Sequence, residues 1–234
     1  KYIYNVMKIL CTVCVRAGSK GLRDKNFLKI NNKYLLCYTL DVAIKSKIFD
    51  QIVVSTDSKK IRTLKKKYKN IDNIKRPQNL ATDSANKIDA IRHAMKFSEK
   101  KKDFKYDIIF DLDATSALRN TSDIKKALKI FKKNNADNLF SVNKSRRNPY
   151  FNVVEKIKGK IKIVKQTKKN IFRRQNAPQT YDMNASIYIW RRKILISSNN
   201  LFRKKTFIYI MDIKRSIDVD NKFDLTLIRN LIRR

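Results

Sequence analysis

The chain has 234 residues, of which 42% are hydrophobic and 10% aromatic, enough to fill the core of one large domain or two small ones. This composition excludes collagen, coiled-coil and wholly disordered proteins. The longest uncharged apolar run, residues 9–15, is far shorter than the roughly 20 residues that a membrane-spanning helix needs. The sequence therefore predicts a folded protein that does not span a membrane.

Positive charge dominates the composition, because 56 Lys and Arg against 20 Asp and Glu give a net charge of +36. Such a field attracts polyanions. The basic residues are nevertheless spread along the chain, without an RNA-binding aromatic stripe, zinc-finger spacing or a basic tail leading into heptads. We therefore expect no specific nucleic-acid partner, and we keep a basic nucleic-acid-binding protein as the alternative of another class.

The first half of the chain alternates apolar runs of strand length with amphipathic segments of helix length, which is typical of a mainly parallel sheet with crossover helices. Strands are predicted at residues 9–15, 51–56 and 106–112. Helices are predicted at residues 35–46, 59–68 and 84–98. Asp57 and Ser58 are suited to cap the second of these helices. The sequence therefore predicts an α/β fold.

The same alternation continues beyond residue 120 and is interrupted once. Thr121 or Ser122 is expected to cap a helix that ends near Lys133, and a strand follows at residues 138–142. The pattern then breaks at a predicted hairpin, with strands at residues 153–157 and 161–165 that turn at Gly159. We therefore expect one domain over residues 1–234 with an arm inserted at about residues 143–183.

The final part of the chain returns to the αβ pattern. Strands are predicted at residues 185–190 and 207–211, and a closing helix at residues 222–232. Four apolar residues of this helix are expected to share one face: Phe223, Leu227, Ile228 and Leu231.

The cysteines and the single histidine predict structural roles. Cys11 and Cys14 lie three residues apart in an expected strand, so their thiols should point to opposite faces. Three cysteines without a disulfide framework indicate a reducing compartment, and we expect a cytoplasmic protein. His93 lies in a helical pattern, and one histidine cannot supply a two-histidine metal site.

Two of the three glycines, Gly18 and Gly21, follow the first predicted strand. Ligands bind beyond the carboxyl ends of strands in open α/β sheets, and glycines there let backbone amides approach phosphate oxygens. Arg16, Lys20 and Lys25 add positive charge at this place. The spacing fits neither the P-loop nor the dinucleotide fingerprint. The segment therefore favours a phosphate-binding loop of another kind, and a simple tight turn is the alternative.

Two pairs of carboxylates are candidates for metal or ligand binding. Asp218 and Asp220 flank one residue, so in an extended segment both point the same way and could hold one Mg²⁺. The alternative is that Asp220 caps the closing helix. Asp111 and Asp113 end the predicted strand 106–112, where carboxylates also commonly cap turns.

Residues 14–26 read CVRAGSKGLRDKN, which resembles the phosphate-loop signature of the CMP-sialic acid synthetase family, the acylneuraminate cytidylyltransferases. Further family blocks follow in order and cover essentially the whole chain: IVVSTD at 52–57, RPQNLATDSA at 76–85, DLDATSALR at 111–119, RNPYFNVVE at 147–155, RRQNAPQTYDMNASIYI at 173–189 and IDVD at 217–220. The motifs DLDATS and DMNASIYIW are most similar to those of family members that act on legionaminic acid. Members that act on sialic acid usually carry Gln at the position of Asp113.

The resemblance implies a Rossmann-like three-layer nucleotidyltransferase fold whose arm serves dimerisation, and a role in surface polysaccharide biosynthesis. The implied reaction joins CTP to a nine-carbon 2-keto sugar acid, and the anomeric hydroxyl attacks the α-phosphorus in line to give CMP-sugar and pyrophosphate. Legionaminic acid is the favoured sugar, and N-acetylneuraminic or pseudaminic acid is the alternative. Nucleotidyl transfer needs positioning and charge neutralisation more than a protein nucleophile, which agrees with a chain that has no histidine-based triad.

Site roles also follow from the resemblance, residue by residue. The triphosphate would be held by Arg16, Ser19, Lys20 and Lys25. The cytidine would be placed by Asn26, Arg76 and Ala85, and the sugar acid by Asp113, Arg174, Gln175, Asn184 and Tyr188. The implied catalytic group is Lys20, Arg16, Asp218 and Asp220, in which Lys20 stabilises the departing pyrophosphate and the two aspartates bind Mg²⁺. A homodimer with shared active sites is the implied assembly.

Two positions depart from the family pattern. Ala17 stands where members usually have a second glycine, which adds a Cβ close to the expected phosphates. Ala117 stands where members have proline, which loosens a turn but removes no chemical group.

Overall fold

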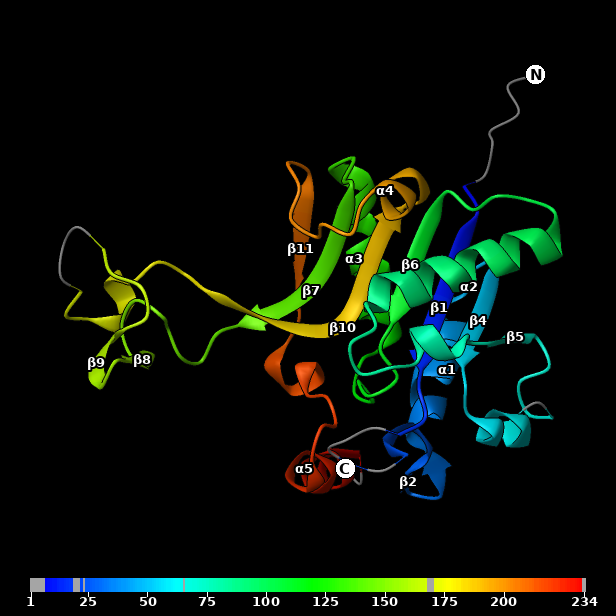
Figure 1. Ribbon diagram of the computed structural model, residues 1–234, viewed down its shortest axis with the longest axis horizontal. Helices are drawn as coiled ribbons and strands as arrows, with labels where there is room; N and C mark the ends of the chain where they lie inside the picture. Colours follow the sequence, from blue (N-terminus) through cyan, green and yellow to red (C-terminus); the bar gives the residue numbers. More distant parts are fainter. Residues whose placement is uncertain (1–6, 19–21, 23, 65, 168–170, 233–234) are drawn as a thin grey trace.

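The computed structural model describes residues 7–18, 22, 24–64, 66–167 and 171–232. Its centre is a seven-stranded sheet in the order β11-β7-β10-β6-β1-β4-β5 (Figure 1). The strands are β1 (Ile9–Val15), β4 (Gln51–Thr56), β5 (Ile71–Lys75), β6 (Ile108–Leu112), β7 (Asn138–Lys144), β10 (Tyr181–Arg191) and β11 (Thr206–Ile210). Only β10 runs against its neighbours β6 and β7, and the other strands of this sheet are parallel. The mostly parallel α/β sheet is therefore confirmed.

Helices cover both faces of the sheet and make three layers (Figure 1). They are α1 (Leu35–Ser46), α2 (Lys87–Lys102), α3 (Thr121–Lys133) and α4 (Arg192–Ser197), whereas α5 (Lys222–Ile232) lies beyond the end of the sheet and packs against Ile30 and Leu35. Side chains of α1 and α3 share one buried cluster with Cys11 and Val13 of β1. Side chains of α2 and α4 share a second cluster with Leu10, against which Cys14 packs. The two thiols thus face opposite layers, as the strand period predicts, and the described cysteines are all free.

Short elements complete the chain around these layers. Two hairpins are formed by β2 (Lys29–Ile30) with β3 (Lys33–Tyr34) and by β8 (Val154–Ile157) with β9 (Lys160–Ile163). Five 3₁₀ turns are η1 (Lys25–Phe27), η2 (Lys59–Leu64), η3 (Gln78–Leu80), η4 (Arg174–Asn176) and η5 (Ile213–Ser216). No helix in the described part of the chain is long and apolar enough to cross a membrane.

Between residues 57 and 75, one predicted helix was wrong and one strand was missed. The predicted helix 59–68 is only the 3₁₀ turn η2, and the edge strand β5 was missed. Ser58 accepts a hydrogen bond from the Lys60 amide, but Asp57 turns instead to the Ala17 amide. The strand was missed because its middle residues are polar and only half-buried, as an edge position allows.

The cap of α3 and the buried face of α5 were also predicted incorrectly. Asn120 caps α3 through a capping box with Asp123, so neither Thr121 nor Ser122 is the cap. The final helix α5 buries Leu225 and Ile228, whereas Phe223 is 75% exposed and does not share the buried face.

The predicted arm leaves the sheet as a ribbon. Strands β7 and β10 continue their pairing to Lys144 and Tyr181, and the β8–β9 hairpin lies beyond them, away from the sheet (Figure 1). The register of β10 on β7 shifts between Met183 and Tyr188, where Ala185 has φ 53°. This irregularity separates the part of β10 inside the sheet from the part in the ribbon.

Candidate active site

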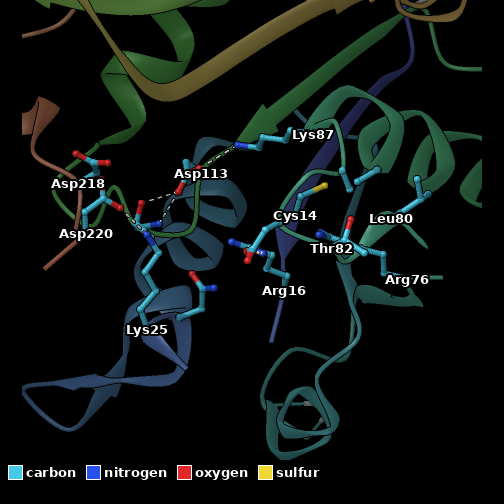
Figure 2. Close-up of a pocket in the computed structure, with 15 residues that line it drawn as sticks. Cys14, Arg16, Lys25, Arg76, Leu80, Thr82, Lys87, Asp113, Asp218 and Asp220 are labelled. Atoms are coloured by element: carbon cyan, nitrogen blue, oxygen red, sulfur yellow. Dashed lines mark hydrogen bonds and ion pairs between the residues drawn. The ribbon is translucent and has the colours of Figure 1, made fainter. Parts of the chain in front are cut away.

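A cavity of about 520 Å³ opens at the carboxyl ends of β1, β5 and β6, beside the start of α2 (Figure 2). This is the edge at which ligands bind in open α/β sheets. Eight residues predicted from the sequence line it: Arg16, Lys25, Asn26, Arg76, Ala85, Asp113, Asp218 and Asp220. Two others, Ser19 and Lys20, lie outside the described residues.

Two cationic side chains of the cavity lining, Arg16 and Lys25, are paired with carboxylates. Arg16 is hydrogen-bonded to Asp83 across the cavity, and the Lys25 ammonium lies 2.6 Å from Asp220 Oδ1. Each pair joins segments that are far apart in the sequence. In the second pair, Lys25 belongs to η1 and Asp220 precedes α5. Anionic ligand oxygens would compete with these carboxylates for the same cations.

The beginning of the phosphate loop and Arg76 are held by hydrogen bonds. The Ala17 amide donates to Asp57 Oδ1 over 2.8 Å, which ties the loop to the end of β4. Arg76 is 6% exposed, and its Nη2 donates to the Ser55 carbonyl oxygen over 2.9 Å. The Arg76 guanidinium is thus held in the cavity lining by Ser55 of β4.

Asp218 and Asp220 both line the cavity, with Val219 buried between them. The cap of α5 is Asn221, whose Oδ1 accepts from the Asp224 amide, while Asp224 accepts from the amides of Asp220 and Asn221. The Asp220 carboxylate therefore does not cap the helix. Burial, followed by the charge of Asp220, raises the pKa of Asp218 to about 6.

Two carboxylates that repel each other in this way suit a divalent cation. Among the described residues, no group of three or more His, Cys, Asp and Glu side chains could hold a metal ion. A cation here would complete its coordination with water and with ligand oxygens, which is how Mg²⁺ usually binds beside phosphates. The donor set therefore fits a hard cation that arrives with a phosphate-bearing ligand.

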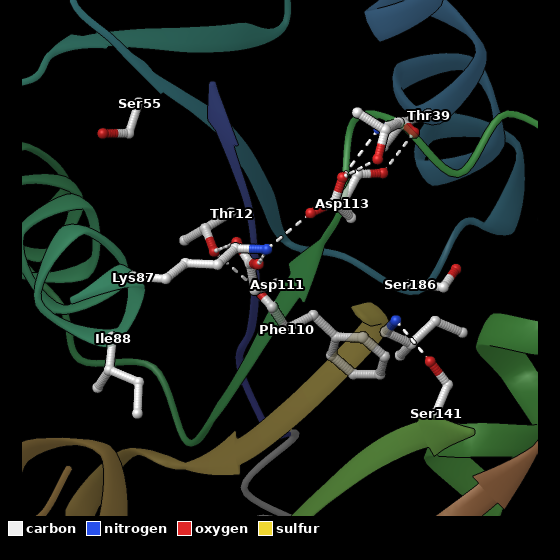
Figure 3. A network of polar contacts seen from close by, with 12 residues as sticks. Thr12, Thr39, Ser55, Lys87, Ile88, Phe110, Asp111, Asp113, Ser141 and Ser186 are labelled. Atoms are coloured by element: carbon white, nitrogen blue, oxygen red, sulfur yellow. Dashed lines mark hydrogen bonds and ion pairs between the residues drawn. The ribbon is translucent and has the colours of Figure 1, made fainter. Parts of the chain in front are cut away.

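Lys87, Asp111 and Asp113 form a charged cluster (Figure 3), of which Lys87 and Asp113 line the cavity. The Lys87 ammonium lies 2.9 Å from Asp111 Oδ2 and 2.9 Å from Asp113 Oδ2. Asp111 is fully buried and accepts from Thr12 Oγ1 over 2.8 Å, while Asp113 Oδ1 accepts from the amide and hydroxyl of Thr115. Burial would lower the pKa of Lys87, but the charges of Asp111 and Asp113 outweigh it and raise the pKa well above its ordinary value.

Arg119 supports this cluster from inside the protein. It is 2% exposed, and its Nη2 donates to the backbone carbonyl of Asp113 over 3.1 Å and to Thr39 Oγ1 over 2.8 Å. Its Nη1 donates to the carbonyl and hydroxyl of Ser186 in β10. Although burial lowers the pKa of Arg119 to about 10, the side chain stays charged at neutral pH. Arg119 thus fixes the backbone of Asp113 against the sheet.

Comparison with known proteins assigns this architecture to a family. The family model described as "Cytidylyltransferase" matches residues 10–231. The chain belongs to the cytidylyltransferase family. It is thus a nucleotidyltransferase enzyme, as the sequence blocks predicted, and the resemblance to the CMP-sialic acid synthetase family is confirmed.

Relatives of this cytidylyltransferase align over most of its length. It is 42% identical over 226 residues to the post-translational flagellin modification protein B of Campylobacter coli, which covers 97% of this chain and 95% of that protein. It is 41% identical over 225 residues to a CMP-N,N'-diacetyllegionaminic acid synthase of Campylobacter jejuni, with 96% and 95% covered. An N-acylneuraminate cytidylyltransferase of Escherichia coli is 29% identical over 224 residues, which are 94% of this chain and 51% of that protein.

Solved structures support the fold. A CMP:2-keto-3-deoxy-manno-octonic acid synthetase complexed with CTP superposes with a TM-score of 0.68 at 14% identity, covering 97% of this chain and 98% of that one. A 4-diphosphocytidyl-2C-methyl-D-erythritol synthase gives 0.70 at 11% identity, with 97% and 98% covered. The Rossmann-like nucleotidyltransferase fold is therefore confirmed.

The structure does not bring all predicted residues of this cytidylyltransferase to the cavity. Arg174 and Gln175 are exposed on the arm and line a separate hollow, where Arg174 Nη2 donates to the Arg146 carbonyl over 2.9 Å. Asn184 is buried and bonded to the hydroxyls of Ser141 and Ser216. In the single chain these three residues therefore lie apart from the cavity lining.

Tyr188 lies next to the cavity without lining it. Its ring stacks on Trp190 with centroids 5.4 Å apart, and the Lys87 ammonium is 5.7 Å from its centroid. Burial raises the pKa of the Tyr188 hydroxyl above its ordinary value. Tyr188 is therefore a neutral neighbour of the cluster formed by Lys87 and the two aspartates.

Several cavity residues of this cytidylyltransferase were missed by the sequence analysis. They are Cys14, Leu80, Thr82, Asp83, Lys87, Ala90 and Thr115. One signal for Lys87 was available, because a lysine in the first turn of a predicted helix opposes the usual preference for acidic residues there. Such an exception indicates a carboxylate partner nearby, although the sequence could not say which one.

Proposed function

We propose that this cytidylyltransferase transfers CMP from CTP to a nonulosonic acid and releases pyrophosphate. The observation that carries the proposal is the cavity itself, where a buried arginine, paired cations and two adjacent carboxylates meet at the strand ends. Relatives at 41%, 29% and 26% identity are named for legionaminic, N-acylneuraminic and pseudaminic acids. Legionaminic acid is the favoured substrate because that relative aligns over 96% of the chain.

The nucleotide is proposed to bind along the two sides of the cavity. Arg76, Asn26 and Ala85 would receive the cytidine, because Arg76 and Asn26 are buried donors and Ala85 adds a small apolar surface. Arg16 and Lys25, together with Ser19 and Lys20 of the loop, would hold the triphosphate. Substrate phosphates would then replace Asp83 and Asp220 as partners of Arg16 and Lys25.

The charge balance of the lining supports a role for Mg²⁺. The described lining contains four cationic side chains, Arg16, Lys25, Arg76 and Lys87, and four carboxylates, Asp83, Asp113, Asp218 and Asp220. These charges cancel, whereas a triphosphate carries several negative charges that must be neutralised. Asp218 and Asp220 would hold the cation, which supplies polarisation of phosphate oxygens when bound.

The chain's own residues would then position the reactants. Arg16, Lys20 and Lys25 would fix the triphosphate so that the sugar hydroxyl meets the α-phosphorus in line with the departing pyrophosphate. Lys20 would neutralise the charge that develops on this leaving group. No protein nucleophile is required by this arrangement, since the attacking oxygen belongs to the sugar acid.

The arm is proposed to reach a second copy of the chain in a homodimer. Its apolar residues Val154, Ile161 and Phe172 are 59%, 62% and 82% exposed in the single chain. Burying them against a partner would be favourable, and it could place Arg174 and Gln175 near the partner's cavity. The free thiols and the absence of a disulfide framework in the sequence support a cytoplasmic location.

Metal binding is expected to depend on pH because Asp218 must lose its proton to act as a ligand. With its pKa raised to about 6, the metal-free protein holds a proton on Asp218 between about pH 4 and 6 that the unfolded chain would release. The stability contributed by this proton is present at low pH and is lost as pH rises through 6, while Mg²⁺ affinity rises over the same range. Calorimetric titration with Mg²⁺ and CTP from pH 5 to 8 measures this effect. A pH-independent affinity would contradict it.

The proposed reaction is tested by pyrophosphate release from CTP and Mg²⁺ with a panel of legionaminic, N-acetylneuraminic, pseudaminic and 3-deoxy-manno-octulosonic acids. We expect release with CTP and one nine-carbon acid, and background rates when ATP, GTP or UTP replaces CTP. Background rates with every acid, from folded protein that binds CTP, would overturn the proposed acceptor class. A circular dichroism spectrum checks that the protein is folded.

A further inference from the structure

Lys87 is the one cation of the described cavity lining that is bound to two carboxylates at once. Its side chain is 38% exposed, whereas that of Asp111 is fully buried and that of Asp113 is 24% exposed. The ammonium thus rests on a buried carboxylate and still faces the cavity. Figure 2 shows it reaching from α2 toward Asp113, on the side of the cavity where Asp218 and Asp220 lie.

Hydrogen-bond capacity shows what this pair can offer to a ligand. An ammonium has three N–H donors, and one of them donates to Asp113 Oδ2, whereas the contact with Asp111 is an ion pair without a hydrogen bond. Asp113 Oδ1 accepts two bonds from Thr115, and Oδ2 accepts one bond from Lys87. Donor capacity on Lys87 and one lone pair on Asp113 Oδ2 are therefore left on two residues that line the cavity.

The charge of the cluster indicates which kind of group would fit. Lys87 and Arg119 are cations, and Asp111 and Asp113 are anions, so the four charges cancel. A phosphate or carboxylate placed here would be repelled by the Asp113 carboxylate. This repulsion would offset its attraction to the Lys87 ammonium. A neutral group that both donates and accepts a hydrogen bond, such as a hydroxyl, matches the donor and the acceptor together.

The neighbours of Lys87 place it on the acceptor side of the proposed reaction. Its ammonium contacts Asp113 and lies 5.7 Å from the centroid of Tyr188. Both residues are among those proposed for the sugar acid. The buried Arg76, proposed for cytidine, instead bonds to Ser55 of β4.

We propose that Lys87 is a specificity-determining residue that, together with Asp113, recognises a neutral hydroxyl or amide group of the acceptor sugar acid. The inference rests on the proposed function and adds to it one residue, Lys87, and the kind of chemical group that this residue recognises. The negative charge of Asp113 needs a cation beside it, whereas a neutral amide side chain at position 113 would not. Lys87 and Asp113 therefore act as one unit. Exchanging only one of them leaves an unpaired charge beside the substrate.

Steady-state kinetics of Lys87→Met and Asp113→Asn test this inference. We expect the sugar-acid KM to rise by about 10- to 100-fold in each variant, as for loss of a hydrogen bond to a charged group, while the CTP KM changes less than about twofold. The Lys87→Met/Asp113→Asn double variant should lose no more than the worse single variant, because the two residues form one unit. The kcat/KM values for sugar acids that differ in one polar group should become more nearly equal in each variant.

Controls separate this role from a structural one. Lys96→Met removes an exposed lysine of the same helix and should leave both KM values unchanged. If Lys87→Met does not fold, Lys87→Met/Asp111→Asn restores the charge balance, and Lys87→Arg keeps the charge with altered geometry. A raised CTP KM with an unchanged sugar-acid KM, or no change in either, would overturn the inference alone. A wild-type enzyme that is silent with every sugar acid would overturn the proposed function and this inference with it.

Discussion

The Asp220→Asn variant should lose more than about 100-fold in turnover, since even a partner that only orients a metal ligand is commonly worth about 10- to 100-fold. Asp220 has a side chain that is 65% exposed, and its capping role is taken by Asn221. Its contact with Lys25 is therefore a surface ion pair, and the free energy of unfolding should change by less than about 1 kcal/mol. Pyrophosphate release against Mg²⁺ concentration, with a thermal melt, measures both quantities.

A matched control for this variant is Asp212→Asn. Asp212 is exposed on the same connection and caps η5 by accepting from the Lys214 amide, and it is absent from the cavity lining. Its exchange should leave turnover and the Mg²⁺ dependence unchanged. Near-normal turnover of Asp220→Asn at low Mg²⁺ would remove Asp220 from the proposed metal site.

The second large effect is expected for Lys25→Met. We expect kcat/KM for CTP to fall by about 100-fold or more, because a fixed cation beside the phosphates neutralises charge that develops in the transition state. The Lys25 side chain is only 21% exposed and reaches Asp220 at 2.6 Å, so its ammonium lies beside one of the two proposed metal ligands. Initial rates over a range of CTP concentrations give the measurement.

Lys29→Met is the matched control for Lys25→Met. Lys29 is exposed in β2 and lies over the ring of Tyr34, with 5.6 Å from its ammonium to the ring centroid. Its loss removes the same charge four residues away and should leave kcat/KM within about twofold, as for other exposed charges. Equal losses in the two variants would mean that general electrostatic attraction, and not a specific contact, accounts for the effect.

The sequence predicted the layered fold because its apolar periods were strong where the strands are buried on both faces. β1 and β4 have the predicted bounds, as do α1 and α5. The failures fall at the edge of the sheet and at helix starts, where local hydrogen bonds decide the structure. A polar edge strand such as β5 has no complete apolar pattern to detect.

The cavity was predicted in outline for a different reason. Arg16 and Asp220 were found from their positions in the strand and loop pattern, and Arg76 through a family block, and the fold brings all three to one edge of the sheet. Asp83 and Lys87 were missed because their roles depend on partners 67 and 26 residues away in the sequence. Spacing along one segment carries no information on such pairs.

The position of β10 between β6 and β7 has a consequence for the order in which the sheet can assemble during synthesis. Strand β7 is hydrogen-bonded to β10 and β11, and both come later in the chain. During synthesis from the N-terminus, β1, β4, β5 and β6 can therefore assemble while β7 still lacks a partner, and the arm must be made before β10 arrives. A ribosome that stalls within the arm leaves a half-sheet with an open edge at β6, which is the kind of surface that chaperones must protect.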